Sequence, residues 1–173
     1  NMQKQIGCFF YDIFQGLGVE PITAKYLNML TLLLLSIILI YIIDRIIRAI
    51  LRALSARIAK QTKSPFDDLL LANKVPRNVA HILPLIIGLN LLPIIFIDFG
   101  FIEIPVRKIL QVLFIVLTLW IVRSVLHTLE DYFKTLPRLK DKPIDSYIQV
   151  FMIFAWITGI IAAIAVFSSV SIW

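Results

Sequence analysis

Residues 44–77 read DRIIRAILRALSARIAKQTKSPFDDLLLANKVPR and decide the fold of this 173-residue chain. A strongly apolar run lies on each side of the stretch. Eight of the seventeen Lys and Arg residues lie within it, namely Arg45, Arg48, Arg52, Arg57, Lys60, Lys63, Lys74 and Arg77. Basic residues gather in the cytoplasmic loops that join membrane-spanning helices. The stretch therefore predicts a cytoplasmic connection between two spans.

The composition favours a membrane protein. The chain is 60% hydrophobic and 16% charged, with a mean hydropathy of +0.90, whereas a soluble domain carries about 25% charged residues. The net charge of +6 does not indicate a nucleic-acid-binding module, because the basic residues lie at the ends of apolar segments. Cys8 is the only cysteine, which excludes a disulfide framework and a cysteine metal site.

Four apolar segments are long enough to span a bilayer. We predict an all-α membrane protein with four transmembrane helices in two hairpins and amphipathic cytoplasmic extensions. A segment at 1–20 precedes a transmembrane region at 21–173, and two interpretations of that segment stay open, a short interfacial helix and a frayed terminus. The predicted spans are 21–43, 77–97, 105–126 and 146–168, and the basic inner connections are 44–76 and 127–145.

The helical pattern of the first span continues beyond Asp44. Arg45, Arg48 and Arg52 fall on one face of this extension, and isoleucines and leucines fall on the opposite face. A helix over 21–60 would be roughly 60 Å long. The hydrocarbon core is only about 30 Å thick. We therefore expect the basic half to protrude from the membrane or to bend along its inner surface.

A helix break is predicted at Ser64-Pro65. Ser64 can cap a new helix, Pro65 suits its first turn, and Asp67 and Asp68 favour the positive end of its dipole. A short helix over 65–72 should follow.

Prolines indicate helix starts and kinks in the rest of the chain. Pro76 restarts the chain into the second span, and Pro84 and Pro93 predict a kink within it. The segment DFGFIEIP at 98–105 predicts a turn, with Pro105 opening the third helix.

The third span also has a polar extension. Arg123, His127, Glu130 and Lys134 recur at helical spacing and predict a stripe along one face. The last span carries Ala155, Gly159 and Ala163 at intervals of four residues. Such small residues let helices approach closely in lipid, so we expect this stripe to pack against a neighbouring helix.

The charge asymmetry predicts the orientation. The first and third connections, with the adjoining helix ends, hold thirteen of the seventeen Lys and Arg residues. Both termini are therefore expected outside and both basic connections inside.

No pattern typical of catalysis, phosphate binding or metal binding occurs, so we predict no enzyme and no cofactor. A site shared by His81 and His127 with Asp67 or Asp68 is one open alternative. The basic face allows three interpretations, which are a topology anchor, pairing with Glu130 or Asp131, and contact with anionic lipid headgroups. The candidates for lipid contact are Arg45, Arg48, Arg52 and Lys60.

Two stretches resemble a known family. TKSPFDDLLLANKVPRNVAHILP at 62–84 and KPIDSYIQV at 142–150 resemble the membrane region of MscS-like mechanosensitive channels, closest to the five-span, miniconductance (YbdG-like) branch. The resemblance covers roughly 27–173 and includes the order of the spans. It implies a homoheptamer of the bacterial inner membrane that opens under tension and releases solutes and ions in hypo-osmotic shock, with membrane lipids as partners.

The resemblance also implies particular roles. The last span would precede the pore helix, and Asp67, Asp68 and Arg77 would belong to an inner coupling turn. A Gly/Ala-rich pore helix and a β-rich cytoplasmic domain should follow, and the sequence up to Trp173 contains neither. The expectation is therefore a tension-sensing region that conducts no ions by itself. The alternatives are a structural or lipid-interacting membrane module without channel activity, and a small transporter with a site at Asn90 between the two proline kinks.

Overall fold

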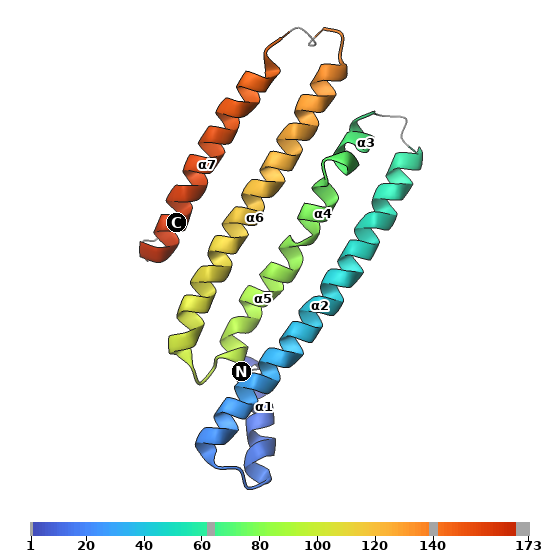
Figure 1. Cartoon of the computed structure of the whole chain (residues 1–173). Coiled ribbons are helices and arrows are strands. Elements are labelled where there is room, and N and C mark those ends of the chain that lie inside the picture. The colour runs from blue at the N-terminus through green and yellow to red at the C-terminus, as the bar shows by residue number, and fades with distance from the viewer. Residues whose placement is uncertain (1, 62–64, 139–141, 169–173) are drawn as a thin grey trace. The chain divides into compact units, whose positions relative to one another are not determined.

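The computed structural model describes residues 2–61, 65–138 and 142–168. Within these ranges every regular element is a helix, which confirms the predicted all-α class (Figure 1). The helices are α1 (Met2–Gly16), α2 (Pro21–Gln61), α3 (Pro65–Ala72), α4 (Val75–Ala80), α5 (Ile82–Ile95), α6 (Gly100–Thr135) and α7 (Ile144–Ser168). The predicted cap at Ser64 lies outside the described residues.

Among the described residues, four helical stretches are long and apolar enough to cross a membrane. They are Pro21–Ser55, Val75–Ile95, Gly100–Thr135 and Ile144–Ser168. In the first, third and fourth, only 6% of the most apolar window is buried inside the chain. A soluble protein would bury such surfaces in its own core, so these helices are those of a multi-pass membrane protein.

The chain divides into two compact units. The first unit comprises Asn1–Ile43 and Pro84–Leu110. Its core lies where the first part of α2 meets α5 and the segment that leads into α6. The buried side chains of this core are Leu32, Leu92, Ile95, Phe96 and Phe99.

Helix α1 ends in a Schellman motif and turns the chain into α2. Gly18 has φ of +83°, and its amide donates to the carbonyl of Gln15 at 3.0 Å. The amide of Val19 donates to the carbonyl of Phe14 at 3.2 Å. A left-handed residue is required at the Gly18 position, which glycine supplies without a steric penalty.

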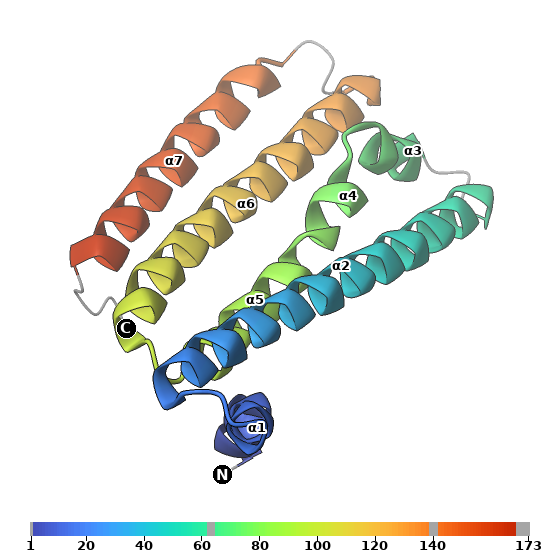
Figure 2. The ribbon, with the colours of Figure 1, turned by 60° about the horizontal axis from the view of Figure 1, so that its bottom comes forward.

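The second unit comprises Asp44–Leu83 and Gln111–Trp173. Figures 1 and 2 show α7 running alongside the second part of α6 in the opposite direction. Gly159 of α7 is buried against Leu119 of α6, so close that a Cβ atom at position 159 would lie 2.6 Å from Leu119 Cδ1. Ala155 and Ala163, the other members of the predicted stripe, are partly buried.

The structure corrects one predicted boundary. Helix α6 begins at Gly100, and Pro105 lies inside it rather than opening it. The turn is completed earlier by backbone hydrogen bonds. The amide of Phe99 donates to the carbonyl of Phe96, and the amides of Ile102 and Glu103 donate to the carbonyl of Phe99. Membrane helices tolerate an internal proline where the freed backbone groups find other partners, so the helix can begin before Pro105.

The second apolar run is divided at His81 into α4 and α5. Pro84 is the third residue of α5 and has no amide hydrogen to donate to the carbonyl of Ala80. Its ring also crowds that carbonyl, so a continuous helix is disfavoured there. The division falls where Pro84 predicts a kink.

Candidate functional site

The short helices α3 and α4 form a joint that is attached to the second part of α6. Asn73 lies just after α3, where its Nδ2 donates to the carbonyl of Leu69 at 3.1 Å and to Asp131 Oδ2 at 3.0 Å. The first bond closes the end of α3, and the second reaches a residue 58 positions later in the chain. One side chain therefore ends α3 and attaches it to α6.

Two further contacts attach the joint to α6. The ring of Phe66 meets the ring of Tyr132 edge to face, with centroids 5.3 Å apart. Asn78 Nδ2, on α4, donates to Ser124 Oγ at 2.7 Å. Because the contacts come from both short helices, a shift of either α3 or α4 would also displace α6.

The residues proposed for the coupling turn lie on this joint. Asp67 and Asp68 occupy the first turn of α3, where acidic side chains favour the helix dipole. Among the described residues, the structure records no side-chain partner for either carboxylate. Arg77 lies in the last turn of α4. The contacts to α6 are instead made by Phe66 and by Asn73 and Asn78, which no sequence motif singles out.

The connection between α3 and α4 contains a strained residue. Lys74 has φ of 58° and ψ of 24°, the left-handed conformation, and precedes the first residue of α4. Glycine and asparagine adopt this conformation readily, whereas a side chain such as lysine costs about 1–2 kcal/mol. This conformation sets the direction in which the Cα–Cβ bond of Lys74 leaves the turn.

The second half of α2 lies beside this joint and carries an ordered basic face. Arg48 donates to the carboxylate of Asp44 one turn earlier, and Arg52 Nε donates to the carbonyl of Arg48 at 3.1 Å. The other oxygen of Asp44, Oδ1, is buried and lies 3.6 Å from His81 Nδ1. These contacts fix the position of the guanidinium groups along α2.

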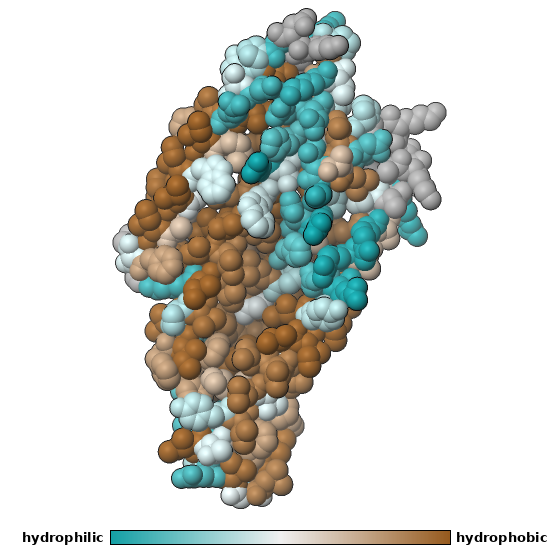
Figure 3. All heavy atoms as spheres, viewed as in Figure 1, coloured by the Kyte–Doolittle hydropathy of each residue, from teal (hydrophilic) through white to brown (hydrophobic). Residues whose placement is uncertain are grey.

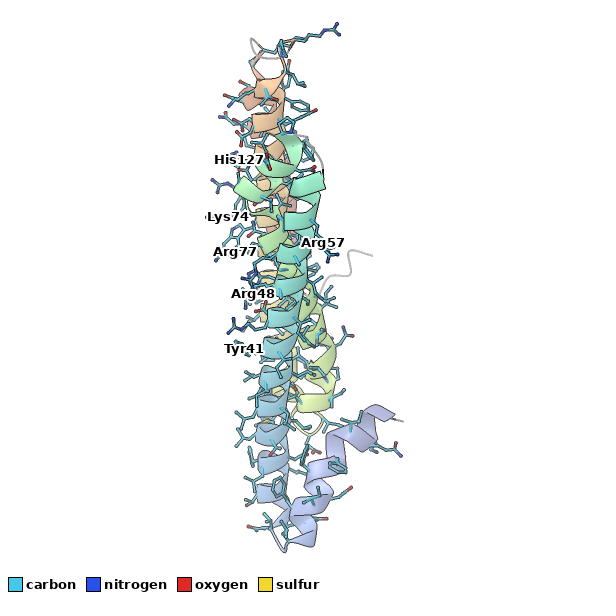
Figure 4. All side chains as sticks on the ribbon, turned by 90° about the vertical axis from the view of Figure 1, so that its right-hand side faces the viewer. Tyr41, Arg48, Arg57, Lys74, Arg77 and His127 are labelled. Atoms are coloured by element: carbon cyan, nitrogen blue, oxygen red, sulfur yellow. The ribbon has the colours of Figure 1, made fainter. Side chains whose placement is uncertain are left out.

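A cavity of about 560 Å³ lies between α2, the end of α3 and α4. Figure 3 shows hydrophilic side chains gathered over this part of the second unit. Figure 4 shows Arg48, Lys74 and Arg77 projecting to the same side of the ribbon, and Arg57 projecting to the other. Five basic side chains line the cavity, namely Arg45, Arg48, Arg52, Lys74 and Arg77.

Three of the four residues predicted to contact lipid line this cavity. Arg45, Arg48 and Arg52 share the cavity, as their common helix face predicts. Lys60 lies near the end of α2, and its side chain is outside the described part of the chain. Lys74 and Arg77 join the three arginines from the other side, which helix periodicity within α2 does not reveal.

The apolar face of the same α2 segment points away from the cavity. Ile46, Ile50 and Leu54 are each about half exposed, at 52%, 52% and 47%. In water such a face would be expected to pack against the protein. Its exposure indicates that lipid or another protein surface covers it.

The polar stripe on α6 forms a series of contacts. Arg123 Nε donates to His127 Nε2 at 3.5 Å, and His127 Nδ1 lies 3.4 Å from Glu130 Oε2. Lys134 Nζ lies 2.7 Å from Glu130 Oε1 and 3.0 Å from Asp145 Oδ1 at the start of α7. The stripe thus links the two arms of the α6–α7 hairpin.

The two histidines have separate partners, Asp44 for His81 and Arg123 with Glu130 for His127. Across residues 2–61, 65–138 and 142–168, no group of three or more His, Cys, Asp or Glu side chains is placed to hold a metal ion. Asn90, the residue proposed for a transporter site, donates to the carbonyl of Ile86 in its own helix at 2.8 Å.

No protein-family model, curated protein or solved structure matches this chain.

Proposed function

We propose that this chain is the tension-sensing transmembrane region of an MscS-like mechanosensitive channel subunit. The subunit acts in the bacterial inner membrane during hypo-osmotic shock, and its N-terminus faces the periplasm. It assembles as a homo-oligomer, and the family resemblance implies a heptamer. The pore helix and the β-rich cytoplasmic domain belong to the remainder of such a subunit.

The attachment of the α3–α4 joint to α6 is the observation that carries this proposal. A tension sensor needs outer helices that can move in the membrane and an element that passes their movement on. Asn73, Asn78 and Phe66 connect the segment after α2 to the helix that leads into the last span. The lipid-exposed apolar surfaces of α2, α6 and α7 are where bilayer tension would act.

The mechanism is a shift of populations. Tension favours whichever state has the larger in-plane area, and the equilibrium moves toward that state. Tilting of the outer helices would displace the joint, and the joint would displace α6 and α7. The adjoining pore helix would respond to α7.

Patch-clamp recording from membranes that contain the complete gene product tests this function. We expect a current that appears with suction and returns to baseline on release. Purified residues 1–173 in a planar bilayer should give no current. A complete protein that stays silent up to the tension at which the patch ruptures would contradict the proposal.

The basic cavity favours a second candidate, a lipid-interacting membrane module without channel activity. Five cations around one cavity are suited to anionic headgroups. This candidate predicts lipid binding by the complete protein and no tension-dependent current, so the same recording separates the two functions.

A further inference from the structure

We propose that the cavity between α2 and the α3–α4 joint is a binding site for a phosphate-bearing anion, either a free phosphate or the phosphate of a lipid headgroup. This inference does not depend on tension sensing, since the site would exist whether or not the chain senses tension, and it deepens the second candidate function by naming the ligand class. It rests on the charges, the geometry and the size of the cavity.

The charges converge from two directions. Arg45, Arg48 and Arg52 come from successive turns of α2, while Lys74 and Arg77 come from the joint. Like charges that face one cavity repel each other, and the repulsion grows as water is excluded. An anion held between them would remove this repulsion and would attach the joint to α2.

Asp44 offsets part of the positive charge at the cavity. Asp44 accepts from Arg48 and faces His81 with its other oxygen. Within the described part of the chain, the structure pairs neither Lys74 nor Arg77 with a carboxylate. The joint therefore supplies two cations whose charge is available to a ligand.

The side-chain chemistry favours phosphate. The planar guanidinium group matches two oxygens of a phosphate at once, and a lysine ammonium adds a point charge. The cavity, at about 560 Å³, has the size of a small-molecule site. Apolar residues also line it, including Leu51 and Leu71, which suit the glycerol and first methylenes of a lipid.

Because Lys74 has a left-handed conformation, a glycine substitution there can distinguish a role in binding from a role in folding. Glycine at this position would relieve the backbone strain and would remove the charge. Lys74→Gly should therefore fold at least as well as the natural chain and bind the anion more weakly. A purely structural role for Lys74 predicts unchanged binding.

Isothermal titration calorimetry of the full chain in a non-ionic detergent tests the site. One arm uses inorganic phosphate, a second uses dioctanoyl phosphatidylglycerol, and a third uses zwitterionic dioctanoyl phosphatidylcholine as the reference lipid. Saturable binding in the first arm identifies free phosphate as a ligand. Binding of phosphatidylglycerol without binding of phosphate identifies the lipid headgroup together with its glycerol and chains.

Four variants make the test specific. Lys74→Gly and Arg77→Gln should each raise the Kd by about fivefold, the value expected for losing one cation beside an anionic group. Asp44→Asn should tighten binding, because it removes the carboxylate that competes for Arg48. Arg57→Gln is the matched control, since Arg57 lies on α2 and projects to the side opposite Arg48, Lys74 and Arg77 (Figure 4).

The expected result is therefore weaker binding by the joint variants, tighter binding by Asp44→Asn and no change with Arg57→Gln. Circular dichroism of each variant checks that the helices are retained. If Arg57→Gln weakens binding as much as Arg77→Gln, the attraction is a general property of the basic surface and the site is wrong. The absence of saturable binding by the natural chain in the phosphate and phosphatidylglycerol arms would also overturn it.

Discussion

Asn28 Nδ2 donates a hydrogen bond of 2.7 Å to the carbonyl oxygen of Gly7, and so attaches α2 to α1. The amide of Tyr11 donates to the other end of the same side chain, Oδ1, at 3.2 Å. Asn28 is only 1% exposed, and both of its polar atoms have partners. Gly7 permits the close approach of α1 to the end of α5 and the turn after it, since a Cβ atom there would lie 3.3 Å from the Ile94 carbonyl oxygen and 3.0 Å from Ile97 Cδ1.

Replacing Asn28 by leucine should release α1 from α2 without unfolding either helix. The Gly7 carbonyl and the Tyr11 amide are four residues apart, so they can bond to each other in a regular helix once Asn28 is gone. The loss should cost about 1–3 kcal/mol of tertiary stability. We expect maleimide labelling of Cys8 in α1 to become several times faster, with unchanged helicity by circular dichroism.

Asn90→Leu is the control for this experiment. Asn90 is exposed and bonds to a carbonyl of its own helix, so its loss should not alter the labelling of Cys8. Equal labelling rates in the natural chain and in Asn28→Leu would mean that Asn28 does not hold α1.

Packing between Gly159 and Leu119 should limit which side chains position 159 accepts. Gly159→Ala places a Cβ atom against the tip of Leu119, and such overpacking typically costs about 1–3 kcal/mol. The stability of the α6–α7 hairpin, measured by SDS-induced unfolding, should fall accordingly. Gly100→Ala is the control, because nothing lies within 4 Å of the added atom at that position.

The same contact predicts a rescue. Adding Leu119→Ala to Gly159→Ala removes the clash, so the double variant should be more stable than the sum of the two single effects, by about 1 kcal/mol. Additive effects would show that the two helices do not meet at this pair.

The predicted orientation can be tested with the native cysteine. In right-side-out spheroplasts, a membrane-impermeant maleimide should label Cys8 in α1 without permeabilisation. Arg57→Cys in a Cys8→Ser background should be labelled only after the membrane is opened, because the basic connection is expected inside. The reverse pattern would contradict the charge argument.

Local sequence patterns account for much of the fold. Pro65, Asp67 and Asp68 predict α3 at 65–72, which is where the structure has it. The spacing of Arg123, His127, Glu130 and Lys134 predicts one polar stripe, and these side chains do contact one another in series. Both features depend on residues within a few turns, so periodicity and capping are sufficient.

The contacts that build the site are beyond such patterns. Asn28 and Gly7 are 21 residues apart, and Asn73 and Asp131 are 58 apart. Their pairing depends on how helices pack, which a single sequence does not encode locally. Asparagine within or beside an apolar helix is a weak signal that a partner is required. The sequence does not indicate the left-handed conformation of Lys74, because that conformation is typical of glycine or asparagine.

The midpoint tension of an Asn73→Leu variant tests the central claim most directly. This change removes the hydrogen bond to Asp131, one of the contacts between the joint and α6, and so weakens their attachment. In patch-clamp recordings of the complete protein, we expect Asn73→Leu to need higher tension for half-maximal opening, while Asn90→Leu responds as the natural protein does. Equal midpoint tensions for Asn73→Leu and the natural protein would contradict the claim that tension is transmitted through the contact between Asn73 and α6.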